Sequence, residues 1–302
     1  MSEALALRTE GLGKRYGTTW ALQDCTLEIP TGSVTALVGP NGAGKTTLLH
    51  LAIGLAKQTT GTVDVLGLSP RHEAKTLLPR LGFVAQDHPL YRSLTIAETF
   101  KLGRQLNPHW NDGVALARVE RLGLKSSQKV GSLSGGQQAQ VALTLALAKE
   151  PELLVLDEPV ASLDPLARRE FLNAVLEATV ESGVSVILSS HIVSELERVC
   201  DYLVTLADGR PQLAGPIREI VASHRLLIGQ RSDASSVARV HNVIRESHTE
   251  RQTTLLVRAN GHVYDCCWEQ HEVDLEDIVL AYLGYKPGAA AANLPSPELA
   301  AR

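Results

Sequence analysis

The run Gly-Pro-Asn-Gly-Ala-Gly-Lys-Thr at residues 39–46 constrains this chain more than any other feature, because it fits the pattern G-x-x-x-x-G-K-[ST]. An apolar run over residues 33–38 precedes it and predicts a short buried strand, and a helical pattern follows from Lys45 to about Gly54. Glycines let successive backbone N–H groups converge on one point, and the helix N-terminus adds partial positive charge there. The sequence therefore predicts a phosphate-binding turn, in which Lys45 reaches the phosphates and the Thr46 hydroxyl binds Mg²⁺.

The length and composition fit a large α/β domain with a smaller second one. The chain has 302 residues, of which 44% are hydrophobic and 21% are charged, as in soluble globular proteins. The formal net charge of −4 supplies no broad basic field, and no Lys/Arg run makes a local one, so we expect no nucleic-acid partner. The start of the chain lacks the features of a signal peptide, and the most apolar stretch, residues 141–148, is too short to span a membrane. We therefore expect a cytoplasmic protein.

The four cysteines, Cys25, Cys200, Cys266 and Cys267, form no C-x-x-C pair and no framework spacing. This pattern favours a reducing compartment, with the thiols packed as small apolar groups. The adjacent pair, Cys266 and Cys267, leaves a redox or metal-binding role open, although neighbouring side chains of a strand point to opposite faces.

The order of the predicted elements indicates a doubly wound parallel sheet with an antiparallel layer beside it. Continuous apolar runs at residues 153–156 and 184–188 are typical of central strands that helices cover on both faces. We expect the other strands within residues 5–29, 62–65 and 82–85, and helices at residues 165–180 and 192–200.

Two further segments differ in pattern from this core. Helical spacing dominates a subdomain over about residues 88–150, with helices expected at residues 95–106, 114–122 and 136–149. After a first domain of residues 1–216, we expect an α+β extension over residues 217–286. It would contain strands at residues 224–230, 253–259 and 262–268 and helices at residues 235–246 and 274–283. The Ala/Pro-rich end, residues 287–302, predicts a disordered tail.

Two carboxylates follow the buried strand at residues 153–156, in the run L-L-V-L-D-E-P. Ligands of such sheets bind beyond the carboxyl ends of the strands, where Asp157 can hold Mg²⁺, through water, and Glu158 can accept a proton from an attacking water. His191 follows the strand at residues 184–188 at the same edge. Taken alone, the acidic pair also fits the N-terminus of a helix, so this interpretation needs a further motif.

The run L-S-G-G-Q at residues 133–137 is that motif. A serine and two glycines at a helix N-terminus present a hydroxyl and free N–H groups, which make a second anion site. Combined with the phosphate turn and L-V-L-D-E-P, this run resembles the signature of the ATP-binding subunits of ABC transporters, over about residues 5–216. The resemblance implies an α/β fold of the P-loop NTPase class: a RecA-like core with an antiparallel β subdomain and a helical subdomain, here followed by the α+β extension.

The resemblance also implies roles for individual residues, with ATP and Mg²⁺ as cofactors. Tyr16 matches the aromatic residue that stacks on adenine, and Gln86 matches the glutamine that senses Mg²⁺ and the attacking water. His191 matches the histidine that contacts the γ-phosphate, and Asp164 matches a residue that communicates across a dimer. Catalysis is thus expected from Glu158, His191 and Gln86, and metal binding from Thr46, Gln86 and Asp157. Nucleotide binding is expected from Tyr16, Gly39, Pro40, Asn41, Gly42, Ala43, Gly44, Lys45, Thr46, Thr47, Ser134, Gly135, Gly136, Gln137 and Asp164.

The same family sandwiches each ATP between the phosphate turn of one subunit and the signature of another, so the resemblance implies a second ATP-binding subunit. It also implies a transmembrane permease that holds the chain at the inner face of the membrane, with Gln86 at the start of the segment that docks it. The stretch E-P-V-A-S-L-D-P-L-A-R-R-E-F is similar to cassettes of drug, antibiotic or lantibiotic exporters. An importer cassette and a soluble ABC ATPase remain alternatives. The chain departs from the family at Gln138-Ala139-Gln140, where basic residues are frequent.

Overall fold

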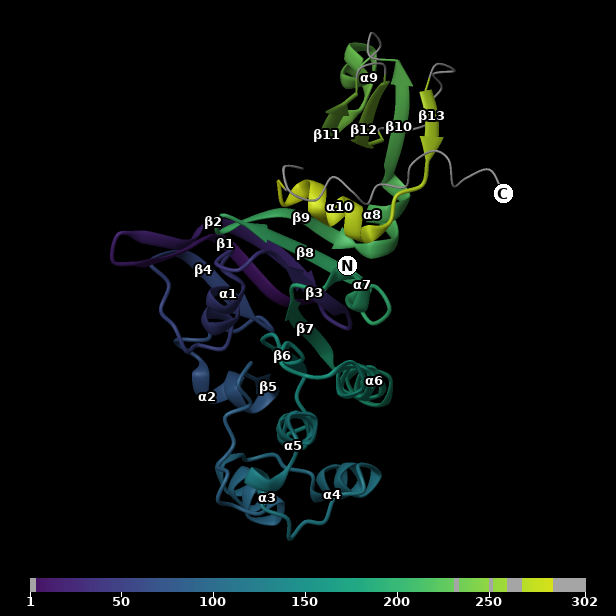
Figure 1. Ribbon diagram of the computed structural model, residues 1–302. Coiled ribbons are helices and arrows are strands. Elements are labelled where there is room, and N and C mark those ends of the chain that lie inside the picture. Colours follow the sequence, from purple (N-terminus) through teal and green to yellow (C-terminus); the bar gives the residue numbers. More distant parts are fainter. Residues whose placement is uncertain (1–3, 231–233, 250–251, 260–267, 285–302) are drawn as a thin grey trace. The chain divides into compact units, whose positions relative to one another are not determined.

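The computed structural model describes residues 4–230, 234–249, 252–259 and 268–284 (Figure 1). Two compact units divide between Ala222 and Ser223. This division lies six residues after the expected boundary, because Ile217 and Ile220 of α8 (Ile217–Ser223) are buried and extend the first unit. The tail expected to be disordered, residues 287–302, lies outside the described residues. None of the helices in these ranges has the length and apolar character needed to cross a membrane.

A six-stranded sheet forms the centre of the first unit, with the strand order β5-β6-β7-β3-β8-β9. Its first five members run parallel, and only β9 is antiparallel to its neighbour. Every residue of β3, β6 and β7 is buried, as is typical of central strands that are covered on both faces. The strands are β5 (Leu81–Val84), β6 (Leu153–Leu156), β7 (Ser185–Ser190), β3 (Val34–Val38), β8 (Tyr202–Ala207) and β9 (Arg210–Pro216).

A three-stranded antiparallel sheet with the order β2-β1-β4 confirms the expected antiparallel layer. It consists of β1 (Leu5–Tyr16), β2 (Thr19–Pro30) and β4 (Thr60–Val65). One apolar core joins it to the helix α1 (Lys45–Ala52) and to the six-stranded sheet, through residues such as Leu12, Leu22 and Leu48. This core holds the start of α1 beside the hairpin of β1 and β2.

Three helices, α3 (Ile96–Leu106), α4 (Asp112–Arg121) and α5 (Gly135–Leu147), form the expected helical segment around a second apolar core. Figure 1 shows α3 and α4 beyond α5, on the side away from the six-stranded sheet. Thr95, Asn111 and Ser134 cap the three helices with their side chains, which fixes where each begins. Two short elements, α2 (Ala74–Leu77) and η1 (Leu78–Arg80), precede β5, and a third, η2 (Val130–Ser132), precedes α5.

The helix α6 (Pro165–Ser182) agrees with the sequence, but the helix predicted at residues 192–200 is wrong for most of its length. The structure has only α7 (Val193–Leu196) there. The Asp201 side chain accepts a hydrogen bond from the backbone N–H of Val34 at 2.9 Å, at the entry to β8. Between α7 and this contact, residues 197–199 form turns.

The second unit is an antiparallel sheet with the order β11-β12-β10-β13. Its elements are β10 (His224–Gln230), α9 (Ala234–Val240), β11 (Asn242–His248), β12 (Gln252–Arg258), β13 (Trp268–His271) and α10 (Leu275–Tyr282). The helix predicted at residues 235–246 is wrong in its second half, because residues from Asn242 onward pair with β12. Pairing with the next strand of a hairpin overrides the helical pattern here. Of the strand predicted at residues 262–268, only Trp268 lies within the described residues.

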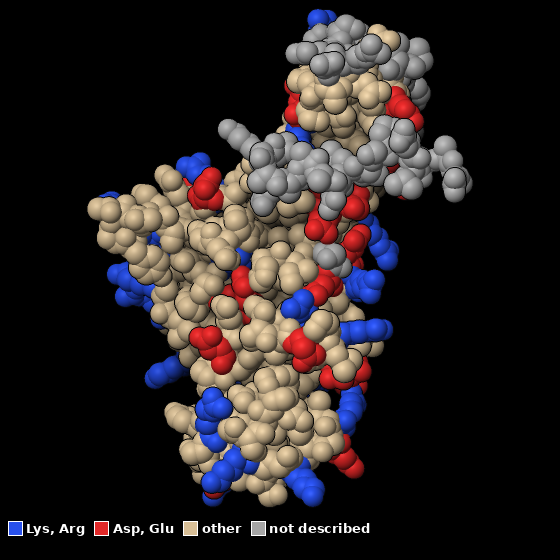
Figure 2. Space-filling model, in the orientation of Figure 1, with Lys and Arg blue, Asp and Glu red and all other residues tan. Residues whose placement is uncertain are grey.

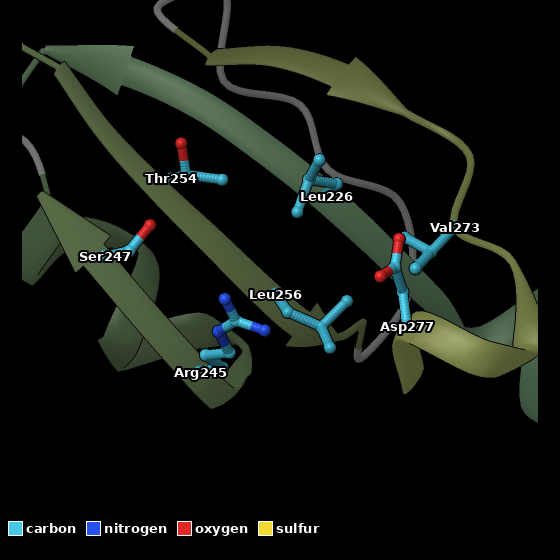
Figure 3. Close-up of a pocket in the computed structure, with 7 residues that line it drawn as sticks. All are labelled: Leu226, Arg245, Ser247, Thr254, Leu256, Val273 and Asp277. Atoms are coloured by element: carbon cyan, nitrogen blue, oxygen red, sulfur yellow. The ribbon is translucent and has the colours of Figure 1, made fainter. Parts of the chain in front are cut away.

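Figure 3 shows a small cavity on one face of this sheet, near the start of α10. Its volume of about 30 Å³ has room for a water molecule or two but for no larger ligand. Burial raises the pKa of Asp277, whereas the charge of Arg245 acts to lower it. The lining residues are Leu226, Arg245, Ser247, Thr254, Leu256, Val273 and Asp277.

Candidate functional site

The phosphate turn (residues 39–46) joins β3 to α1, as the sequence predicts. Gly44 has a φ of 102°, and a Cβ atom there would lie 2.5 Å from the carbonyl oxygen of Ala21. Both the conformation and the close backbone therefore demand glycine. Lys45 begins α1, and its ammonium donates to the carbonyl oxygens of Gly39, at 2.8 Å, and Pro40, at 3.3 Å.

The Glu158 carboxylate lies between two side chains of this site. One oxygen is 3.2 Å from Lys45 Nζ, and the other is 3.2 Å from His191 Nδ1. Lys45 and Glu158 are 5% and 13% exposed, so solvent screens their ion pair far less than one at the surface. Glu158 also has a φ of 44°, in the left-handed region that few non-glycine residues adopt. Such strain is a feature of functional loops.

A hydrogen-bond network around the neighbouring residue, Asp157, connects to the backbone of Glu158. Asp157 accepts at the same oxygen from Thr46 Oγ1, at 3.1 Å, and from Ser189 Oγ, at 2.8 Å. Ser189 Oγ in turn accepts from the backbone N–H of Glu158 at 2.8 Å. Ser189 is absent from the sequence-predicted site. The signal that could have revealed it is a pair of polar residues, Ser189 and Ser190, at the end of an otherwise apolar strand.

The structure gathers most of the predicted residues around one open pocket of about 620 Å³. Tyr16 is 53% exposed at its rim, with Lys14 Nζ 4.7 Å from the centre of the ring. Gln86 follows β5 and also lines the pocket, as do Ala21 and Ala161, which the list of predicted site residues does not contain. The predicted residues that line the pocket are Tyr16, Asn41, Gly42, Ala43, Gly44, Lys45, Thr46, Thr47, Gln86, Glu158 and His191.

The signature residues and Asp164 are not part of this pocket within the described chain. Ser134 caps α5: its hydroxyl accepts from Gln137 N–H at 3.2 Å, and its own N–H donates to the Gln137 side chain at 3.0 Å. Gly136 lies so close to Ala167 of α6 that a Cβ atom would clash at 2.6 Å. Asp164 caps α6 by accepting from the N–H groups of Leu166 and Ala167. Ser134, Gly135 and Gln137 face solvent, where a second molecule can reach them.

The donors of the site suit Mg²⁺ bound together with phosphates. Thr46, Asp157 and Gln86 offer hydroxyl, carboxylate and amide oxygens, which this cation prefers. No cluster of three or more His, Cys, Asp or Glu side chains with the arrangement of a metal site occurs among the described residues. Water molecules or phosphate oxygens would complete the octahedral coordination of Mg²⁺.

The first unit also carries surface charges and two described cysteines, Cys25 and Cys200. Figure 2 shows Lys and Arg interspersed with Asp and Glu on this face of the first unit. Burial raises the pKa of Cys25 to about 11 and that of Cys200 to about 12, so both thiols stay protonated and inert at neutral pH. Cys266 and Cys267 lie outside the described residues.

Comparisons with family models and with known proteins indicate the same family. The family model described as "ABC transporter" matches residues 22–161, and a model for an AAA domain matches residues 128–197. The lantibiotic transport ATP-binding protein SrtF of Streptococcus pyogenes is 31% identical over 206 residues, which cover 68% of this chain and 88% of SrtF. The phosphonates import ATP-binding protein PhnC of Maricaulis maris is 35% identical, over 70% of this chain and 89% of PhnC.

Solved structures agree with this result. The dimeric, post-hydrolysis state of the ATP-binding cassette MJ0796 bound to ADP and Pi has a TM-score of 0.62 at 25% identity, and the match covers 70% of this chain and 98% of that one. The predicted fold class is thereby confirmed, while the relatives include a lantibiotic transport protein and a phosphonates import protein.

Proposed function

Because the chain belongs to the ATP-binding subunits of ABC transporters, we propose that it hydrolyses ATP and that hydrolysis energises a separate membrane permease. The position of the Glu158 carboxylate, between the Lys45 ammonium and the His191 ring, supports this function most directly. A carboxylate at the mouth of a phosphate turn is placed to accept the proton of a water that attacks the γ-phosphate.

The Lys45–Glu158 ion pair suggests how nucleotide binding activates the site. Phosphate oxygens carry more negative charge than one carboxylate, so they draw the Lys45 ammonium toward the β- and γ-phosphates. Glu158 then loses one partner and becomes free to act as the base, while His191 holds its other oxygen. Thr46, Gln86 and Asp157 would hold Mg²⁺, which neutralises charge on the phosphates when it is bound.

We assign the remaining predicted residues to contacts with the adenine ring of ATP and with a second subunit. Tyr16 at the rim of the pocket offers a half-exposed ring on which adenine can stack. The exposed N-terminus of α5, with Ser134, Gly135, Gly136 and Gln137, offers a hydroxyl and N–H groups to an anion. Because it lies outside the pocket of its own chain, we propose that it binds the γ-phosphate held by a second cassette, with Asp164 at the same interface. Two cassettes would then enclose two nucleotides.

An apolar groove on the first unit supports the proposal that the chain binds a permease. Its volume is about 630 Å³, and it lies between the segment from α2 to β5 and the helices α3 and α5. Leu106 and Leu55 on its walls are 72% and 67% exposed, which is unusual for large apolar residues grouped together. Lys149 lies at the groove, where its ammonium donates to the Leu81 carbonyl at 2.7 Å. Such a groove fits an amphipathic helix of a partner, and we assign it to a cytoplasmic segment of the permease.

The direction of transport is a further proposal. The stretch over residues 158–171 resembles exporter cassettes, and SrtF and the bacitracin transport protein BcrA of Enterococcus faecalis are among the relatives. We therefore propose export, with the chain held peripherally at the inner face of the membrane by its permease.

Hydrolysis is tested by Glu158→Gln. The amide keeps the shape of the side chain but cannot accept the proton of the water, so ATP binding should persist and phosphate release should fall by at least ~100-fold. Glu177→Gln, which alters an exposed ion pair with Arg121, is the matched control and should leave the rate unchanged. A Glu158→Gln variant that releases phosphate at the wild-type rate would show that another group is the base.

Coupling is tested at the groove by Leu106→Asp. The control is Leu116→Asp on α4, because Leu116 is also exposed, at 56%, but does not line the groove. With the permease co-expressed, Leu106→Asp should reduce co-purification and the stimulation of hydrolysis, and both variants should keep the basal rate. Equal stimulation in the two variants would place the permease elsewhere, for instance on residues 87–97.

A further inference from the structure

Arg168 joins two segments of the site and has no part in the roles assigned above. It lies in the first turn of α6, and its guanidinium makes contacts in two directions. Nη1 donates to the Glu195 carboxylate of α7 at 2.7 Å, and Nη2 donates to the Leu163 carbonyl at 3.2 Å. The side chains of Arg168 and Glu195 are 18% and 30% exposed, so both charges are largely buried. The guanidinium thus bridges the acidic loop (residues 157–163) and the His191 segment (residues 191–196).

The geometry of this ion pair suits a bridge between segments. A guanidinium and a carboxylate can pair through two parallel hydrogen bonds. Here one hydrogen bond joins them, and Arg168 Nε and Glu195 Oε2 are buried without a partner among the described residues. Because buried polar atoms without partners cost free energy, the stability of the pair does not by itself account for this arrangement. Its second nitrogen instead reaches the acidic loop.

Two successive turns connect Glu158 to the bridged carbonyl. The N–H of Ala161 donates to the Glu158 carbonyl at 3.2 Å, and the N–H of Leu163 donates to the Val160 carbonyl at 3.1 Å. The Leu163 side chain is buried, which holds this end of the loop in place. The backbone from Glu158 to Leu163 is therefore folded on itself, and Arg168 contacts its far end.

The His191 segment needs tertiary contacts to keep its conformation. Its helix, α7, has only four residues, and a single helical turn is not stable by itself. Val193 and Leu196 fix its apolar side in the core, and Glu195 supplies the contact with α6. At the start of the segment, His191 Nδ1 lies 3.2 Å from the Glu158 carboxylate. The two segments therefore meet twice, directly at Glu158 and again through the bridge.

We propose that Arg168 is a positioning residue, whose bridge holds the His191 segment against the acidic loop. The bridge keeps the His191 ring at the Glu158 carboxylate during hydrolysis, so this inference rests on the proposed function. Neither Arg168 nor Glu195 lines the nucleotide pocket. Loss of the bridge should therefore lower the rate of hydrolysis and leave ATP binding unchanged.

Two substitutions of Glu195 separate the hydrogen bond from the charge. In Glu195→Gln, the amide oxygen still accepts from Arg168, whereas Glu195→Met removes the acceptor and keeps a long side chain. We expect Glu195→Met to lower kcat by about tenfold to 100-fold, as for a small displacement of a catalytic group, with the Kd for ATP unchanged. Glu195→Gln should keep kcat within about twofold of wild type, because its hydrogen bond remains.

Two further variants control for the substitution itself. Glu197→Met changes an exposed glutamate just after α7 and should behave as wild type. Glu195→Met leaves a largely buried guanidinium without its carboxylate, which can destabilise the chain. The double variant Arg168→Met/Glu195→Met removes both charges and should show the same loss of kcat.

Nitrogen-15 NMR of the His191 ring supplies a readout that does not depend on hydrolysis. An ionised carboxylate only accepts hydrogen bonds, so the contact with Glu158 places the proton of the neutral ring on Nδ1. The nucleotide-free full-length chain is measured at about pH 8.5, where an ordinary imidazole is neutral, and His191→Gln identifies the signal. Wild type, Glu195→Gln and Glu197→Met should show the Nδ1–H tautomer, and Glu195→Met should lose it.

The two readouts separate this inference from the proposed function. If wild type does not hydrolyse ATP, the proposed function fails, while the tautomer of His191 still decides whether the bridge positions the ring. A wild-type ring without the Nδ1 proton, or a Glu195→Met ring that keeps it, would overturn the inference. So would a kcat of Glu195→Met or of the double variant equal to that of Glu197→Met. Equal losses of kcat in Glu195→Gln and Glu195→Met would exclude the hydrogen bond as the cause.

Discussion

Replacing Ser189 by alanine is expected to destabilise the acidic loop without removing a group that lines the nucleotide pocket. Ser189 is fully buried, and its Oγ donates to Asp157 and accepts from Glu158 N–H, each at 2.8 Å. The substitution removes both hydrogen bonds and leaves the buried Asp157 carboxylate with the Thr46 hydroxyl at 3.1 Å. The change is small in volume, so lost polar contacts and not a cavity dominate its effect.

The magnitude follows from these two contacts. A hydrogen bond to a charged group contributes about 1.5–3 kcal/mol, and a buried N–H deprived of its acceptor costs about 1 kcal/mol or more. The lower figure applies to Glu158 N–H, because this residue borders an open pocket from which water can replace the hydroxyl. The free energy of unfolding of the first unit should thus fall by about 3 kcal/mol, equivalent to a decrease in Tm of roughly 6–12 °C.

Urea unfolding followed by tryptophan fluorescence measures this loss, because Trp20 and Trp110 both lie in the first unit. Trp268 contributes equally to every variant. The matched control is Ser190→Ala on the same strand, where the hydroxyl accepts only a hydrogen bond from Ile192 N–H at 3.1 Å among the contacts described, worth about 1 kcal/mol. If Ser189→Ala loses no more stability than Ser190→Ala, the network does not stabilise the loop and the reasoning is refuted.

Three further changes probe the turn, the signature and the extension. Lys45→Ala should weaken ATP binding by about 2–3 kcal/mol, roughly 30–150-fold, because it removes a charge-assisted contact to phosphate. Titration calorimetry measures the ATP affinity, and an unchanged affinity would contradict that contact. Ser134→Arg should leave the ATP affinity of the monomer unchanged but abolish ATP-driven dimers in light scattering; a dimer of normal strength would exclude the shared site. A chain that ends at Ala222 should fold and bind ATP. A chain that ends at Ala214 lacks the last residue pairs of β9 with β8 and two buried isoleucines of α8, so its free energy of unfolding should be lower by about 4 kcal/mol. Equal urea midpoints of the two shortened chains would contradict the boundary found here.

The sequence alone determined the local features of this protein. Glycine at position 44, before a lysine and a threonine, predicts the turn at the start of α1, because only glycine takes that conformation so close to other backbone. Ser134, followed by two glycines, predicts a helix N-terminus, and the structure closes it with a capping box between Ser134 and Gln137, three residues apart. The unbroken apolar run of β6 predicts a central strand. Each of these signals acts between residues that are near neighbours in the chain.

Only the tertiary structure decided which side chains meet. Thr46 and Asp157 are 111 positions apart, and Glu158 and Ser189 are 31 apart, so no local pattern reports their hydrogen bonds. The error at β11 has another cause: hydrogen bonds to the next strand, β12, override the helical spacing of residues 242–246. Parallel pairing brings strand ends from distant parts of the chain to one edge, and that edge is where this site forms.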